Sequence, residues 1–124
     1  MTKRILIVDD DLYLRELYQE VLASEGYEVD LGTNGEEGLA KLQQGEYDLV
    51  FLDVIMPKLD GIGVLESLSK NPPLKPNGPI ILLTNLKDDP LLQDVKSKGA
   101  GGYLIKADLN PQDFLNHAKK LLDN

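Results

Sequence analysis

Short apolar segments recur along the chain and predict five β-strands. Most are nearly continuous runs of aliphatic residues, which is typical of strands covered on both faces, as in a parallel sheet. The segment at residues 27–31 alternates instead, with Glu28 and Asp30 on one face, and this predicts a strand at the sheet edge. The five segments are residues 5–8, 27–31, 49–52, 80–83 and 103–105.

Between these segments, apolar residues recur with the spacing of an amphipathic helix. Gly26 is placed to cap the C-terminus of the first helix. Asn34 and Pro90 are placed to open the second and the fourth helix, and the third helix ends before Pro72. Asn110 and Pro111 open the fifth. The apolar stripes are Leu14, Leu17, Tyr18, Val21 and Leu22; Leu39 and Leu42; Ile62, Leu65 and Leu68; Leu91, Leu92 and Val95; and Phe114, Leu115, Ala118, Leu121 and Leu122.

Strands that alternate with helices without a break predict an α/β fold with a parallel sheet. Right-handed crossovers with helices on both faces leave few topologies. The best known is the flavodoxin-like, doubly wound (βα)5 arrangement with strand order 2-1-3-4-5. The chain has 124 residues, which fits one domain, and we expect residues 1–124 to form it.

Composition excludes several classes of site. The chain has no cysteine, so disulfides, thiolate zinc sites and cysteine nucleophiles are impossible, and its single histidine, His117, excludes multi-histidine sites. The net charge of −8 argues against direct binding of nucleic acid. The apolar run at residues 5–8 is too short for a secretory signal or a membrane span, so we expect a cytoplasmic protein.

Polar residues follow the predicted strands at the point where each one ends. Three aspartates at residues 9–11 follow the first strand, and Asp53, Thr84 and Lys106 follow the third, fourth and fifth. Ligands of open parallel sheets bind beyond the carboxyl ends of the strands. In the expected strand order these side chains meet at one edge of the sheet.

The charges of this cluster call for a cation or a proton. Two carboxylates about 4 Å apart repel by roughly 4 kcal/mol at an effective dielectric constant of 20. Lys106 alone cannot neutralise Asp9, Asp10 and Asp53, so the site should bind a divalent cation or retain a proton. All-oxygen ligands favour Mg²⁺ or Ca²⁺, and Mg²⁺ commonly combines one or two carboxylates with waters and a phosphate oxygen.

These residue types together suggest phosphoryl chemistry. The carboxylate of Asp53 can act as a nucleophile on phosphorus and form an acyl phosphate. A metal ion and Lys106 would neutralise the phosphoryl oxygens, and the hydroxyl of Thr84 would donate a hydrogen bond to one of them.

The sequence resembles the receiver domain of bacterial two-component response regulators, the family that includes the chemotaxis response regulator. The resemblance spans nearly the whole chain and rests on four motifs in order. They are Ile-Leu-Ile-Val-Asp-Asp-Asp at residues 5–11, Asp-Val-Ile-Met-Pro-Lys-Leu-Asp-Gly at residues 53–61, Thr84, and Gly-Ala-Gly-Gly-Tyr-Leu-Ile-Lys at residues 99–106.

The resemblance implies a role for each residue of the site. Asp53 would be phosphorylated, Lys106 would contact the phosphoryl group and Thr84 would turn inward to bond it. Tyr103 would be the aromatic switch that becomes buried when Thr84 moves. Mg²⁺ would be held by Asp10, Asp53 and the backbone carbonyl of Ile55, with Asp9 bound to it directly or through water.

The resemblance also implies the partners. A histidine kinase or phosphotransfer protein would donate the phosphoryl group, and the surface of the fourth helix, fifth strand and fifth helix would signal to a downstream protein. We expect no turnover of a separate substrate, and either a monomer or a phosphorylation-dependent homodimer.

The chain departs from the family pattern in three places. Asn85 follows the threonine where a small residue is usual. Ala107 follows Lys106 where the family usually has a cis-proline. A cis bond before alanine costs about 3–4 kcal/mol, so we expect a trans bond and a different placement of Lys106. Ile55 and Leu86 are apolar where side chains flank the path of the hydrolytic water, and our hypothesis is a slowly hydrolysed phosphoryl group.

Two other functional classes remain open. An aspartate-based Mg²⁺ phosphatase of the haloacid-dehalogenase type needs a second aspartate two residues after the nucleophile, where this chain has Ile55. A degenerate receiver would dock partners without being phosphorylated. The chain could be a free-standing regulator or part of a longer protein with a DNA-binding domain.

Overall fold

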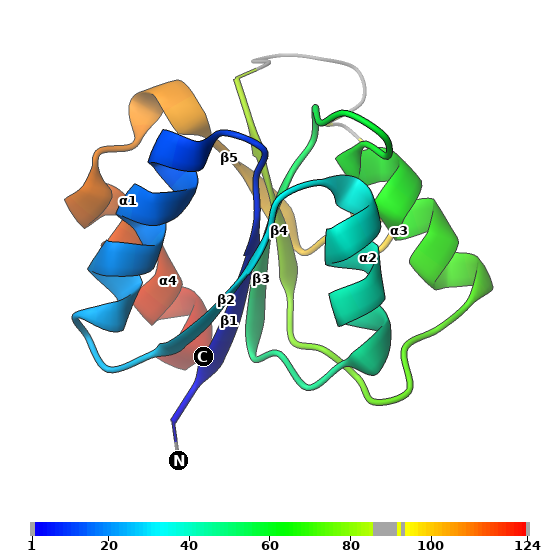
Figure 1. Ribbon diagram of the computed structural model, residues 1–124, viewed down its shortest axis with the longest axis horizontal. Coiled ribbons are helices and arrows are strands. Elements are labelled where there is room, and N and C mark those ends of the chain that lie inside the picture. Colours follow the sequence, from blue (N-terminus) through cyan, green and yellow to red (C-terminus); the bar gives the residue numbers. More distant parts are fainter. Residues whose placement is uncertain (1, 86–91, 93, 124) are drawn as a thin grey trace.

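The computed structural model describes residues 2–85, 92 and 94–123, which form a parallel sheet between two helical layers (Figure 1). The sheet order β2-β1-β3-β4-β5 confirms the predicted topology and places β2 at an edge. The strands are β1 (Arg4–Val8), β2 (Glu28–Gly32), β3 (Leu49–Asp53), β4 (Ile80–Thr84) and β5 (Gly102–Ile105).

Helices α1 and α4 cover one face of the sheet, and α2 and α3 cover the other (Figure 1). They are α1 (Leu12–Ala23), α2 (Gly35–Gln44), α3 (Gly61–Lys70) and α4 (Pro111–Asp123), with a short 3-10 helix, η2 (Lys106–Asp108), after β5. The predicted fifth helix is α4. The predicted fourth helix falls mostly on residues 86–91 and 93, outside the described residues, and Val95 lies in a turn. No helix in the described part is long and apolar enough to cross a membrane.

Side-chain caps explain where the helices begin. Asp11, Asn34 and Asp60 each accept a hydrogen bond from a backbone N–H one turn into α1, α2 and α3, at 3.1, 2.9 and 2.7 Å. The prediction that Gly26 caps the C-terminus of the first helix is confirmed: the N–H groups of Gly26 and Tyr27 donate to the carbonyls of Ala23 and Leu22 at 3.0 and 3.4 Å, which closes the last turn. Helix α1 ends at Ala23, and Gly26 adopts φ +90° in the turn that follows.

The sheet separates two apolar cores, because successive side chains of a strand point to opposite faces. Leu6 and Val8 of β1 pack in the core under α2 and α3. Ile5 and Ile7 pack in the other core, under α1 and α4. This second core has aromatic rings at its centre: Tyr18 stacks on Phe114 at 4.0 Å, and Phe51 lies 4.5 Å from the same ring.

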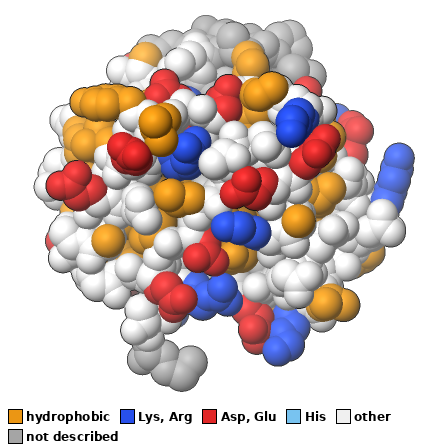
Figure 2. Space-filling view, viewed as in Figure 1, with side chains coloured by type: hydrophobic (Ala, Val, Ile, Leu, Met, Phe, Trp, Pro, Cys, Tyr) orange, Lys and Arg blue, Asp and Glu red, His pale blue; other side chains and the backbone are white. Residues whose placement is uncertain are grey.

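The edge strand β2 is protected by charge. Figure 2 shows acidic and basic side chains side by side over the middle of the face that β2 crosses. Arg4 forms ion pairs there with Glu28 and Asp30, at 3.9 and 3.5 Å. Charged side chains of this kind discourage pairing with a strand of another chain.

Candidate functional site

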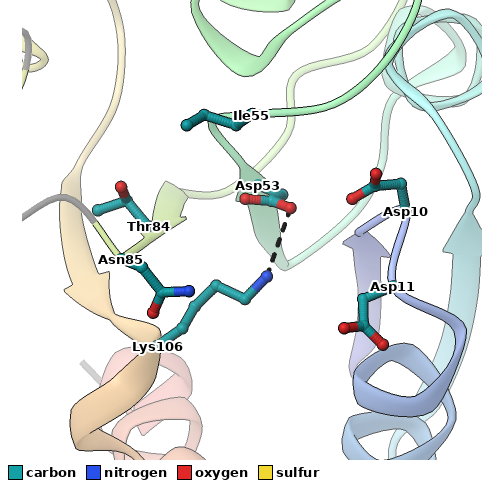
Figure 3. Close-up of a pocket in the computed structure, with 7 residues that line it drawn as sticks. All are labelled: Asp10, Asp11, Asp53, Ile55, Thr84, Asn85 and Lys106. Carbon is teal, nitrogen blue, oxygen red and sulfur yellow. Dashed lines mark hydrogen bonds and ion pairs between the residues drawn. The ribbon is translucent and has the colours of Figure 1, made fainter.

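A cavity of about 420 Å³ lies at the carboxyl edge of the sheet, where the sequence predicted the polar cluster (Figure 3). The strand register creates it: Val8 pairs with Leu52, and Asp53 with Leu83, so the residues after β1 and β4 lie beside Asp53. Figure 3 shows Asp10 and Asp11 on one side and Lys106 reaching toward Asp53 from the other. The lining residues are Asp10, Asp11, Asp53, Ile55, Thr84, Asn85 and Lys106.

The turn between β1 and α1 gives its three aspartates different environments. Asp9 is fully buried, and its Oδ1 accepts a hydrogen bond from the backbone N–H of Asp11 at 2.9 Å. Asp11 is exposed and caps α1 through Leu14. Asp10, between them, is exposed and faces the cavity (Figure 3).

Asp53 ends β3 and is 5% exposed. The loop after it folds back closely: the N–H of Gly61 donates to the carbonyl of Val54 at 2.8 Å. A Cβ at position 61 would lie 2.5 Å from the carbonyl oxygen of Asp53. Glycine is therefore required here for the loop to approach the backbone that carries Asp53.

Lys106 follows β5 and reaches both buried carboxylates. Its Nζ lies 3.0 Å from Oδ2 of Asp9 and 3.4 Å from Oδ2 of Asp53. The bond between Lys106 and Ala107 is trans, as the sequence predicted. The alanine in place of a cis-proline therefore leaves Lys106 in contact with the acidic cluster.

Burial and charge perturb the ionisation of this cluster. Burial, together with the neighbouring Asp9, raises the pKa of Asp53 to about 7, although Lys106 acts in the opposite direction. Burial lowers the pKa of Lys106, but the contacts with Asp9 and Asp53 outweigh it, and the net shift is upward. The acidic cluster thus binds its lysine tightly and still has an excess of negative charge.

The acidic cluster has the donor atoms of a metal site. Carboxylate oxygens of Asp9, Asp10 and Asp53 lie within 4.8 Å of one another. Oδ2 of Asp9 is buried beside the ammonium of Lys106 at 3.0 Å, and one ammonium does not neutralise three carboxylates. These three residues could therefore hold a metal ion, and their hard oxygen donors suit Mg²⁺.

The other predicted residues lie around the cavity or near it. Thr84 is buried at the end of β4, Asn85 is exposed, and Ile55 is 62% exposed at the rim. Tyr103 of β5 is 45% exposed and does not line the cavity. Leu86 lies outside the described residues. The ligand role of the Ile55 carbonyl stays a prediction.

Sequence reasoning missed Arg15. This residue is 8% exposed, and its Nη1 donates a hydrogen bond to the backbone carbonyl of Asp9 at 2.6 Å. Its position could have indicated that it is buried, because Arg15 lies three residues before Tyr18 and seven before Leu22. These are the three buried residues of α1, on one helical stripe.

Comparison with known proteins identifies relatives along nearly the whole chain. The model of the response regulator receiver domain family matches residues 5–119. A CheY-like receiver domain protein from Methanospirillum hungatei JF-1 has a crystal structure that superposes with a TM-score of 0.85 at 33% identity. It covers 99% of this chain and 95% of that one.

Curated relatives include both short and long proteins. Chemotaxis protein CheY of Thermotoga maritima is 31% identical over 107 residues, which cover 86% of this chain and 87% of that protein. The probable transcriptional regulator ycf27 of Cyanophora paradoxa is 38% identical over 120 residues, 97% of this chain but 48% of the relative. The chain spans about half the length of several transcriptional regulators that it matches.

Proposed function

The chain belongs to the response regulator receiver domain family of two-component systems, and on that premise we propose that it accepts a phosphoryl group on Asp53. The donor is a histidine kinase or a phosphotransfer protein. The observation that carries the proposal is the position of Asp53, a buried carboxylate in an open cavity with the ammonium of Lys106 at 3.4 Å.

In the proposed reaction, a carboxylate oxygen of Asp53 attacks the phosphorus of a phosphohistidine. The O–P bond forms as the N–P bond breaks, and the bonding electron pair leaves with the imidazole. Lys106 neutralises negative charge on the phosphoryl oxygens, and the hydroxyl of Thr84 donates to one of them. The negative charge that the phosphoryl group adds at Asp53 is thus stabilised by groups that already line the cavity.

We propose Mg²⁺ as the required cation, held by Asp9, Asp10, Asp53 and the backbone carbonyl of Ile55. Support comes from the convergence of the three carboxylates, whose negative charge exceeds the single positive charge of Lys106. A bound Mg²⁺ would supply positive charge to the attacking carboxylate and to the phosphoryl oxygens.

Signalling would use the surface beside β4 and β5. Thr84 pairs with Ile105 of β5, two residues beyond the half-exposed Tyr103. Inward movement of Thr84 would bury Tyr103 and change the surface of β5 and α4, where a downstream protein or a second copy would bind. We propose a cytoplasmic switch that acts on itself and turns over no separate substrate.

The alternatives have less support. The phosphatase hypothesis requires a carboxylate at position 55, where this chain has an exposed isoleucine. The hypothesis of a degenerate receiver rested on the unusual residues Asn85 and Ala107. Lys106 nevertheless contacts both Asp9 and Asp53. Slow hydrolysis stays a hypothesis: Ile55→Asn and Leu86→Glu should speed dephosphorylation, and unchanged rates would remove it.

Intact-mass measurement tests the proposed function. The protein is incubated with a small phosphodonor and Mg²⁺, beside a sample with chelator and the Asp53→Asn variant. We expect a gain of one phosphoryl group in the complete reaction only. Asp60→Asn is the matched control, because it removes a carboxylate outside the cavity and keeps the cap of α3. No gain with either a small phosphodonor or a panel of kinases would contradict the proposal.

A further inference from the structure

Helix α1 buries a cation where its stripe would otherwise be apolar. Arg15 shares the buried face of α1 with Tyr18 and Leu22. A buried guanidinium is costly unless its N–H groups find acceptors. Its Nη1 lies 2.6 Å from the carbonyl oxygen of Asp9, and this oxygen belongs to the peptide group between Asp9 and Asp10.

The peptide group on the other side of Asp10 is also fixed. The backbone N–H of Asp11 donates to Oδ1 of the buried Asp9 at 2.9 Å. Asp10 therefore lies between two anchored peptide groups, one bonded by Arg15 and one by the Asp9 side chain. These two bonds restrict the backbone on both sides of Asp10, whose exposed carboxylate faces the cavity (Figure 3).

We propose that Arg15 is a positioning residue of the acidic site: by anchoring the Asp9 carbonyl, it holds the Asp10 carboxylate where a divalent cation binds between Asp9, Asp10 and Asp53. The inference rests on the proposed Mg²⁺ site and names the residue outside the cavity on which that site depends.

The size of the effect follows from the role of residues that orient metal ligands. Loss of such a partner typically weakens metal binding by about 10–100-fold while the ligands themselves stay in place. Asp10 has the most to lose, because it is exposed and its direction depends on the two anchored peptide groups. Asp53 is held independently, by β3 and by the close approach of Gly61.

The test measures the Mg²⁺ dissociation constant by NMR titration of the full chain. Arg15→Met keeps the length of the apolar stem and removes the donor, so we expect binding to weaken about tenfold or more. Arg15→Lys restores a donor and the charge and should recover part of the affinity. Leu22→Ala is the control, because it weakens the same buried face of α1 two turns away from the site.

Each outcome decides between a positioning and a merely structural role. If Arg15→Met and Leu22→Ala lower the melting temperature and weaken Mg²⁺ binding alike, or if Arg15→Met binds Mg²⁺ as the wild type does, the inference is overturned. If Arg15→Met does not fold, Arg15→Lys and Leu22→Ala are compared instead. Weaker Mg²⁺ binding by Arg15→Lys than by Leu22→Ala then supports the inference, and equal Mg²⁺ binding by the two variants overturns it. A wild-type protein that binds no Mg²⁺ instead contradicts the proposed function.

Discussion

Asp53→Asn should stabilise the metal-free protein, and the gain should depend on pH. The substitution keeps the shape of a side chain that is 5% exposed and removes its negative charge. That charge is unfavourable in the free protein because of burial and the nearby Asp9. A residue proposed to carry out the chemistry therefore lowers the stability of the fold that holds it.

The pKa of Asp53 sets the size of the gain. Its rise from 3.8 to about 7 spans about three units, and at 1.36 kcal/mol per unit the ionised group destabilises by up to about 4 kcal/mol. The amide of asparagine faces the ammonium of Lys106 with a second donor, which offsets about 1–2 kcal/mol. We expect a net gain of about 2–3 kcal/mol above pH 8.

The sign follows from proton binding. Between pH 3.8 and about 7 the folded state retains the proton of Asp53 and the unfolded state has lost it, so wild-type stability falls as pH rises through this window. Asparagine has no proton to lose. The advantage of the variant should be smallest near pH 4 and complete above about pH 8.

Urea unfolding with chelator, at several pH values from 4.5 to 8.5, measures this difference. Asp11→Asn is the matched control: it removes an exposed carboxylate from the same cavity and retains the cap of α1, so its stability should change by less than about 0.5 kcal/mol. A gain for Asp53→Asn that is constant with pH, or a loss at pH 8.5, would refute the electrostatic reasoning.

Three further substitutions test separate parts of the structure. Lys106→Met leaves two buried carboxylates without their cation and should cost about 3 kcal/mol at pH 8.5. The cost should be smaller at pH 5.5, where Asp53 is protonated, and urea unfolding at both pH values measures the difference. Gly61→Ala forces a methyl group against the Asp53 backbone and should lower both the melting temperature and Mg²⁺ affinity; unchanged affinity would contradict the close approach. Tyr47→Phe removes the 2.7 Å hydrogen bond to Asp30 and should abolish the phenol titration near pH 12 in ultraviolet absorbance.

The sequence predicts the fold well because each strand is marked by a distinct apolar pattern. The alternation of Glu28 and Asp30 was enough to identify β2 as an edge strand. Helix ends were predicted where a side chain caps them, as at Asn34 and Asn110. The end of α1 was predicted from Gly26, because glycine readily adopts the positive φ that the turn closing the helix requires.

The site was predictable as a set of residues but not as a set of contacts. Strand order brings Asp53, Thr84 and Lys106 to one edge, and this follows from topology. The pairing of Lys106 with Asp9 depends on side-chain length and on the path of the loop after β5. Arg15 acts through a backbone carbonyl, and such an acceptor leaves no trace in the sequence.

The division of the interior by the sheet has a consequence for how this sequence can diverge. Among the described residues the two cores share no side chain, so a substitution at Val64 of α3 and one at Phe114 of α4 should act additively on stability. Mutations fixed in one layer then need no compensating change in the other. Helices α2 and α3 can be repacked over generations while the aromatic rings of Tyr18, Phe51 and Phe114 stay unchanged on the opposite face.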